Sequence, residues 1–225
     1  MTPFPNMGLA QPEQDEDPNP SRAKGNCVGI GSGVMVATTD GPQPVEWLRA
    51  GDLLMTRDHG YQPLRRVWKT EIPDDQRLQI IHAGSLSHDM PSMNLAVGPD
   101  HGLLMSGAEI EIHFGEEEAL APAACLGTPD TRENDRRSVW PAPNTSLYQL
   151  LLDDHEIILA EGVWIESFRI DDANFADHDE ETRGALEVLL GDRIGAMEAA
   201  RLCLTRDEAR LFKPMETTTK SQRIA

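Results

Sequence analysis

Cysteine and histidine are the residue types of this chain that we consider first as candidates for chemistry. A thiolate is a nucleophile and a metal ligand, and an imidazole can give or take a proton near neutral pH. The three cysteines, Cys27, Cys125 and Cys203, lie far apart along the 225 residues. So few and so scattered, they predict neither a disulfide framework nor a zinc site. Cys125 and Cys203 stand among apolar residues, and we interpret both as small hydrophobic side chains.

The seven histidines show no spacing typical of metal ligands, and we expect no metal and no cofactor. Five of them carry no further signal: His59, His82, His88, His113 and His178. The other two, His101 and His155, each follow an aspartate and lead into an apolar strand. Asp100 is a possible hydrogen-bond partner of His101. These are the two histidines that a turn between strands could hold at a polar site.

Short strands separated by turns must position these side chains. The stretch 33–68 begins with an apolar, β-branched run at 34–37 and has turn points at Asp40-Gly41, Gly51-Asp52 and His59-Gly60, where glycine can supply a positive φ. Turns this closely spaced leave no room for a helix of ordinary length. We therefore predict a series of short strands here.

Two later stretches continue this pattern. Residues 94–107 give an apolar strand, a Gly-Pro-Asp turn and a second strand that His101 leads into. Residues 147–168 give three strands joined by two tight turns, with His155 at the start of the second strand. Both stretches therefore place a histidine where a turn meets a strand.

The residues between these stretches also predict strands. Residues 108–120 alternate apolar and polar side chains, with Ile110, Ile112 and Phe114 on one face, which predicts a half-buried strand. Pro122 limits residues 119–126 to an edge strand or a short turn.

After residue 171 the apolar period becomes helical. Leucines and alanines at helical spacing predict a helix within 180–194. Thr205 and Glu208 form a capping box, which predicts the start of a short helix that runs through Phe212. We expect one or two helices in this C-terminal part.

In this order, the β-rich pieces resemble the Hedgehog/intein module, called Hint, and look closest to its bacterial members that stand largely alone. Four segments carry the resemblance: VEWLRAGD (45–52), TRDHGYQP (56–63), GPDHGLL (98–104) and DDHEIILAEGVWIESF (153–168). It covers about residues 30 to 170. It implies a mostly β fold, a flattened, pseudo-symmetric horseshoe of short antiparallel strands.

The resemblance also implies a chemistry on the chain's own backbone. In a Hint module a cysteine attacks the preceding carbonyl to form a thioester, and a histidine polarises the scissile peptide and protonates the departing nitrogen. These roles fall on Cys27 and His101. Asp100 and His155 are then supporting residues of the same site. The alternative for His155 is a structural role at the start of its strand.

Two departures from the family pattern stand at these positions. Counting back from the turn at 38–41 puts the family's cysteine position on Gly29, two residues after Cys27. A two-residue shift along a strand moves a side chain by about 6–7 Å, whereas near-attack geometry tolerates about 3–3.5 Å. The family's hydroxyl donor, three residues before His101, falls on Gly98, which has no side chain.

We therefore expect a degenerate, non-catalytic Hint domain that acts as a soluble structural or interaction module. Cys27 is then a thiol in a loosely ordered lead-in, and His101 is hydrogen-bonded to backbone at a turn. The alternative is a protein that cleaves its own N-terminal segment through Cys27 with His101. Splicing would need a C-terminal His-Asn pair before Cys, Ser or Thr, which the ending at 221–225 does not provide. Calcium binding by the acidic turns lacks a spaced acidic repeat.

The composition of the chain excludes some classes of binding partner. The formal net charge is −18, which argues against binding to nucleic acid or to an anionic membrane surface. No apolar run approaches the ~20 residues that span a bilayer, and the N-terminus has no basic segment followed by an apolar core. We expect a cytoplasmic protein whose partner is another protein or its own N-terminal segment. Export without an N-terminal signal stays open.

The predicted domain organisation has four parts. Residues 1–27, rich in proline, asparagine and acidic groups, and residues 214–225, which are polar, are expected to be disordered tails. Residues 28–172 form the Hint-like β domain, and residues 173–213 form a helical segment.

Overall fold

The computed structural model describes residues 27–72, 77–86, 89–129, 146–171, 175–176 and 180–211. The two predicted tails lie outside these ranges, except for Cys27. His88 and His178 also lie outside them.

One sheet is built from six short strands among the described residues, in the order β11-β7-β8-β1-β12-β6. In chain order these strands are β1 (Ile30–Gly31), β6 (Arg66–Thr70), β7 (Gln79–Ile81), β8 (Leu95–Val97), β11 (Thr128–Pro129) and β12 (Leu147–Leu151). β1 lies in the middle of the sheet, where Ile30 pairs with both Tyr148 and Val97. The start of the described chain is therefore fixed between two long-range neighbours.

The second sheet has nine described strands, in the order β15-β10-β9-β14-β13-β2-β4-β5, with β3 added beside β2. Its strands are β2 (Met35–Thr38), β3 (Gly41–Pro44), β4 (Leu53–Thr56), β5 (Gly60–Pro63), β9 (Gly102–Ser106), β10 (Glu118–Pro122), β13 (Ile157–Ala160), β14 (Val163–Glu166) and β15 (Leu202–Cys203). Every pairing between described strands is antiparallel except the one between β10 and β15. The prediction of a mostly β fold of short antiparallel strands is confirmed.

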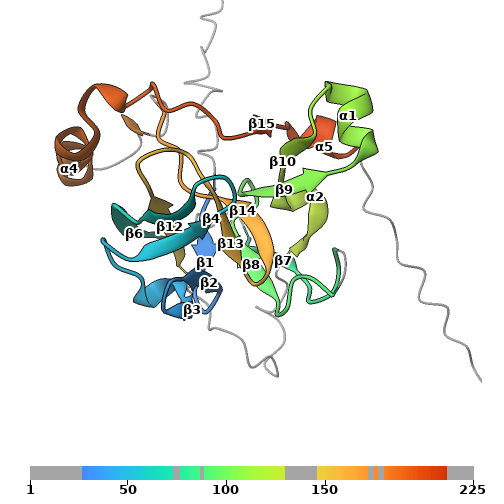
Figure 1. Ribbon diagram of the computed structural model, residues 1–225, viewed down its shortest axis with the longest axis horizontal. Helices are drawn as coiled ribbons and strands as arrows, with labels where there is room; N and C mark the ends of the chain where they lie inside the picture. Colours follow the sequence, from blue (N-terminus) through green and yellow to red (C-terminus); the bar gives the residue numbers. More distant parts are fainter. Residues whose placement is uncertain are drawn as a thin grey trace, which may run out of the picture.

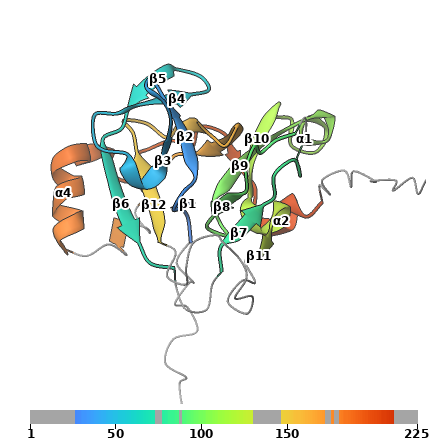
Figure 2. The same cartoon turned by 90° about the horizontal axis from the view of Figure 1, so that it is seen from below.

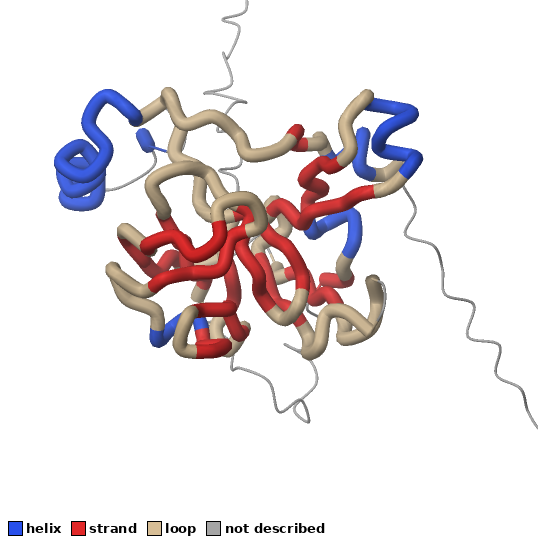
Figure 3. The backbone as a smooth tube through the Cα atoms, in the orientation of Figure 1, coloured by secondary structure: helices blue, strands red, loops and turns tan. Residues whose placement is uncertain are grey.

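The main hydrophobic core draws side chains from both sheets. Strands β4, β9 and β13 of the nine-stranded sheet contribute Leu54, Leu103 and Ile158, and strands β7, β8 and β12 of the other contribute Ile81, Leu95 and Leu150. In Figures 1 and 3 the strands occupy the middle of the molecule and most of the helical residues lie at its two ends. Figure 2 shows the same separation, with α4 (Glu180–Leu190) at one end and α1 (Ala108–Phe114) at the other.

The prediction of a strand over 108–120 is wrong, because the first part of this stretch is helix α1. Ile110 and Phe114 are four residues apart, a spacing that shares a face in a helix as well as in a strand. Gly107 at φ 142° and Gly115 at φ 73° delimit the helix. Ile110 is 3% exposed but Ile112 is 77% exposed, as expected if only one of the two faces the core.

The prediction that residues 119–126 form only an edge strand or a short turn is also wrong. They form most of β10, which lies between β9 and β15, and then helix α2 (Ala123–Leu126). Pro122 is tolerated because it is the last residue of the strand.

The C-terminal helices follow the predictions more closely. α4 confirms the helix within 180–194, and η3 (Gly191–Arg193) continues it as a 3₁₀ turn. The capping box of Thr205 and Glu208 is confirmed at the start of α5 (Arg206–Ala209). The described helix is shorter than expected, and Phe212 lies outside the described residues. A further 3₁₀ turn, η1 (Val45–Trp47), follows β3. Within the described ranges no helix is long and apolar enough to cross a membrane.

Candidate functional site

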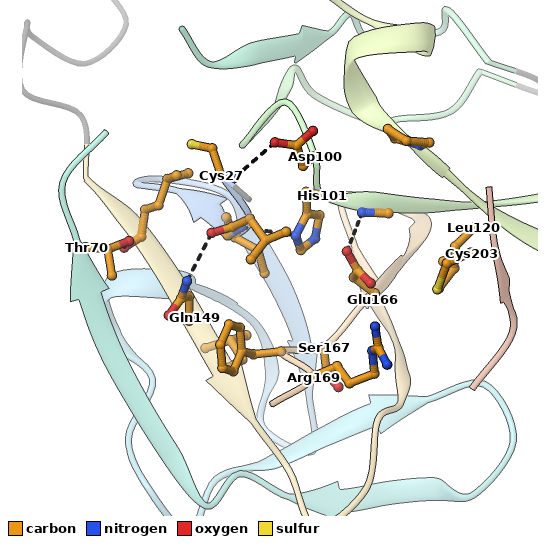
Figure 4. Close-up of a pocket in the computed structure, with 18 of the residues that line it drawn as sticks. Cys27, Thr70, Asp100, His101, Leu120, Gln149, Glu166, Ser167, Arg169 and Cys203 are labelled. Carbon is orange, nitrogen blue, oxygen red and sulfur yellow. Dashed lines mark hydrogen bonds between the residues drawn. The ribbon is translucent and has the colours of Figure 1, made fainter. Parts of the chain in front are cut away.

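A cavity of about 650 Å³ gathers the candidate residues (Figure 4). Cys27, Asp100 and His101 line it together with Gln149 and Glu166. These side chains come from the lead-in to β1, from the turn before β9, and from β12 and β14. The two sheets therefore build the cavity jointly.

Backbone hydrogen bonds tie the lead-in to the turn before β9. The amide of Cys27 donates to Asp100 Oδ2 over 3.0 Å, and the amide of Asp100 donates to the Cys27 carbonyl over 3.2 Å. The amide of Gly98 donates to the Gly29 carbonyl over 2.9 Å. Residues 27–29 are thereby held in place like a short additional strand.

The peptide unit between Val28 and Gly29 is held at both of its polar atoms. The amide of Gly29 donates to His101 Nδ1 over 3.2 Å, and Gln149 Nε2 donates to the Val28 carbonyl over 3.3 Å. Because Nδ1 accepts a hydrogen bond, the neutral ring carries its proton on Nε2. Burial lowers the pKa of His101, which favours this neutral form.

A largely buried carboxylate lies beside this histidine. Glu166 accepts the amide hydrogen of Gly102 over 2.6 Å, and its Oε2 lies 3.3 Å from His155 Nε2. His155 Nδ1 accepts from the amide of Ala200 over 3.0 Å, so the proton of the neutral ring again lies on Nε2, toward Glu166. Burial opposes ionisation of Glu166, yet His155, His101 and the amide of Gly102 together hold its pKa below the usual range.

His101 Nε2 is buried and has no hydrogen-bond partner among the described residues. In Figure 4 the carboxylate of Glu166 lies beside the imidazole of His101. Glu166, whose side chain is 14% exposed, is therefore a largely buried anion flanked by two imidazoles, one of which contacts the Val28–Gly29 peptide. Such an arrangement can polarise the Val28–Gly29 amide through the hydrogen bond that His101 Nδ1 accepts.

Gly29 and Gly98, the two positions at which the chain differs from the family pattern, have no room for a side chain. Gly29 has φ 140°, a value that strongly favours glycine, and a Cβ there would lie 2.9 Å from Leu147 Cβ. A Cβ on Gly98 would lie 2.1 Å from the Cys27 carbonyl oxygen. In this arrangement neither a nucleophile at position 29 nor a hydroxyl donor at position 98 can be accommodated.

Two interpretations of the cysteines are wrong. Cys27 is not a thiol in a loosely ordered lead-in, because it is 5% exposed and belongs to the main core. Cys203 is not packed among apolar residues as a small hydrophobic side chain, because it is exposed on β15, where it lines the cavity. Cys125 is half-buried against the small cluster beneath α1 and α5, which agrees with its interpretation as a small hydrophobe.

The structure places the four candidate residues within one connected group. Cys27 contacts Asp100, and His101 accepts a hydrogen bond from the amide of Gly29. His155 is connected to this group through Glu166. Sequence reasoning missed Glu166 and Gln149. Gln149 is the one strongly polar residue in the apolar run of β12, a signal that could have found it.

Within the described residues no group of histidine, cysteine, aspartate or glutamate is arranged to hold a metal ion.

Comparisons with known proteins bear on the chain as follows. The model of the Hint domain family matches residues 28–172. The crystal structure of the gp41-1 intein is similar with a TM-score of 0.38 at 11% identity, covering 61% of this chain and 97% of that one. The solution structure of a bacterial intein-like domain from Clostridium thermocellum has a TM-score of 0.36 at 13% identity, covering 63% and 99%. No curated protein matches.

Proposed function

Since the chain belongs to the Hint domain family, we propose that it is a Hint domain that has lost self-processing and acts as a structural or interaction module. One observation carries the proposal. The residue whose amide His101 holds is Gly29, which has no nucleophile and, at φ 140° beside Leu147, no space for one. An acyl shift needs a side-chain nucleophile at that residue.

The rest of the site supports the same proposal. Gly98 supplies no hydroxyl, and the Cys27 carbonyl occupies the space that a side chain there would need. His101, which accepts from the Gly29 amide, and Gln149, which donates to the Val28 carbonyl, hold the peptide unit in place. In a chain without a nucleophile at Gly29, these hydrogen bonds fix the first described residues to the core.

The test is the intact mass of the purified full-length chain, before and after incubation with a small thiol at neutral pH. We expect the full mass of 24.9 kDa to persist in both samples. Circular dichroism on the same sample establishes that the protein is folded. Thiol-dependent loss of a segment that ends at residue 26 or 28 would contradict the proposal.

Self-processing through Cys27 with His101 is the second candidate, and one observation favours it. The amide of Cys27 is held by the carboxylate of Asp100, and its side chain lines the same cavity as His101. In this reaction the Cys27 thiolate would attack the carbonyl of residue 26 to form a thioester, and the bond from that carbonyl to the Cys27 nitrogen would break. His101 would first have to be protonated, and would then give its proton to the departing nitrogen. Water or the added thiol would release the segment from the thioester. Any cleavage should then vanish in both Cys27→Ala and His101→Ala. Cleavage that persists in either variant would exclude this mechanism.

A further inference from the structure

A segment beyond the matched region returns to the cavity. Residues 200–206, here called the strap, follow α4 and η3, and the part from Cys203 to Arg206 lines the cavity. Figure 1 shows the chain crossing from the end with α4 through β15 to the end with α5. The family match stops at residue 172, so the strap is an addition to the Hint domain of this chain.

Arginines anchor the strap at both of its ends. Arg201 pairs with Asp58 and with Glu118, each over 2.8 Å. Arg206 Nε donates to Asp100 Oδ1 over 3.0 Å. The hydrogen bond from Arg201 holds the pKa of Asp58 below its usual range, which agrees with a formed ion pair.

The middle of the strap is held by few contacts. β15 pairs with β10 only at Leu202 and Cys203, and both side chains are exposed. Leu204 is buried against the small cluster beneath α1 and α5, and its amide donates to the Leu120 carbonyl over 2.8 Å. A two-residue edge strand and one buried leucine are weak attachment compared with the neighbouring antiparallel strands.

Both ends of the strap also touch the candidate site. The amide of Ala200 donates to His155 Nδ1, which directs the other ring nitrogen to Glu166. Arg206 binds the same Asp100 carboxylate that accepts the Cys27 amide. Movement of the strap would therefore remove one partner from His155 and one from Asp100.

We propose that the strap is a hinged cover of the cavity, and that its opening, with both sheets intact, controls access to the cavity from solvent. The anchoring side chains are only partly buried, with Arg201 23% and Arg206 45% exposed, so salt screens these ion pairs and they release at a moderate free-energy cost. Local opening then precedes global unfolding, as expected for a segment with few buried contacts. The cover works in this way whether or not the chain processes itself.

Hydrogen exchange of the full-length chain, read by mass spectrometry, tests the local opening. Arg206→Gln should speed exchange in the peptide covering 200–204 by roughly threefold, the size expected for one partly exposed ion pair. Arg201→Gln should speed it more, because it removes two ion pairs. Exchange in β9 and β14 should stay at the wild-type rate. Arg210→Gln is the matched control, because Arg210 pairs with Asp207 within the α5 region and not with the β domain.

Alkylation of Cys27 by iodoacetamide, located by peptide mapping, tests the access. Cys27 is buried and lines the cavity, so its rate should rise in the same ratio as the strap exchange, and added salt should raise both in the wild type. Unchanged strap exchange in both variants would overturn the proposal, as would faster exchange spread through β9 and β14. Faster strap exchange with unchanged Cys27 alkylation would show that the strap does not control access.

Discussion

Gly29 determines what His101 can do. His101 accepts the amide hydrogen of Gly29, and Gln149 donates to the Val28 carbonyl of the same peptide bond. These contacts can promote cleavage of that bond only if a nucleophile reaches the carbonyl. At position 29 the chain has a glycine with φ 140° packed against Leu147. The same contacts then contribute to stability, because they satisfy two buried backbone groups.

The packing at Gly29 gives a first prediction. Gly29→Ala should destabilise the protein by about 3 kcal/mol, since positive φ and overpacking each cost about 1–3 kcal/mol. Gly107→Ala is the control, because Gly107 has φ 142° and a Cβ added there would meet nothing within 4 Å. Urea denaturation should show the smaller loss for Gly107→Ala. Equal losses would mean that the backbone angle alone, and not the space near Leu147, restricts position 29.

Burial of His101 gives a second prediction. Its pKa is lowered in the folded state, so between that value and the unfolded value of about 6.5 the unfolded chain binds more protons. Stability should therefore fall as pH drops below about 6.5. His101→Gln should reduce this loss in urea denaturation curves at several pH values. His82→Gln, at an exposed histidine that contacts Thr128, should keep the wild-type dependence. An unchanged slope in His101→Gln would contradict the assignment.

Counting residues from recognisable turns in the sequence identifies part of the site but not the rest. The turn at 38–41 and the position of His101 are enough to identify Gly29 as the residue to compare with the family cysteine. Glu166 and Gln149 were missed because each acts on a backbone group far away in the sequence, at Gly102 and Val28. No short-range pattern encodes which strand ends will face each other across a cavity.

At the scale of elements, the family resemblance and the prediction of a mostly β fold were confirmed, and the errors arose where one pattern fits two structures. The spacing of Ile110 and Phe114 suits a strand and a helix equally, and Gly115 was not recognised as a helix end. In the structure Gly115 has φ 73° and its amide donates to the Glu111 carbonyl. This left-handed residue closes α1 and turns the chain back toward β10.

Two glycine substitutions with opposite expected signs test this interpretation of the helices. Gly115→Ala should destabilise the protein by about 1 kcal/mol, because alanine resists the left-handed angle that ends α1. Gly184→Ala should stabilise it by about 0.5–1 kcal/mol, because Gly184 lies inside α4 with open space around it. Thermal denaturation of both variants measures the signs. Stabilisation by Gly115→Ala would mean that α1 can continue past residue 115.

At the scale of the whole molecule, residues 180–211 of the segment after the matched region contribute to the folded core. Leu186, Leu190 and Met197 pack with Phe168 and Ile170 of the matched region in one buried cluster. Leu204 and Ala209 complete a second cluster with Ile110, Ala119 and Ala121. The proposed boundary at 172/173 therefore separates a family motif from its extension, while the packing crosses it.

A truncated chain tests whether the matched region can fold alone. Removing residues 173–225 exposes the apolar surface that Leu186, Leu190 and Met197 cover, and burial of each such side chain contributes about 1.5–3 kcal/mol. The total is comparable to the stability of a typical domain, about 5–15 kcal/mol. We expect the truncated chain to lose cooperative urea unfolding and the dispersed amide spectrum of a packed protein. Removal of residues 212–225 alone is the control, because it keeps every described contact and should leave unfolding unchanged. Cooperative unfolding of the 1–172 chain with wild-type stability would instead make the helical segment a separate unit, and the strap would then be a contact between two independently folded parts.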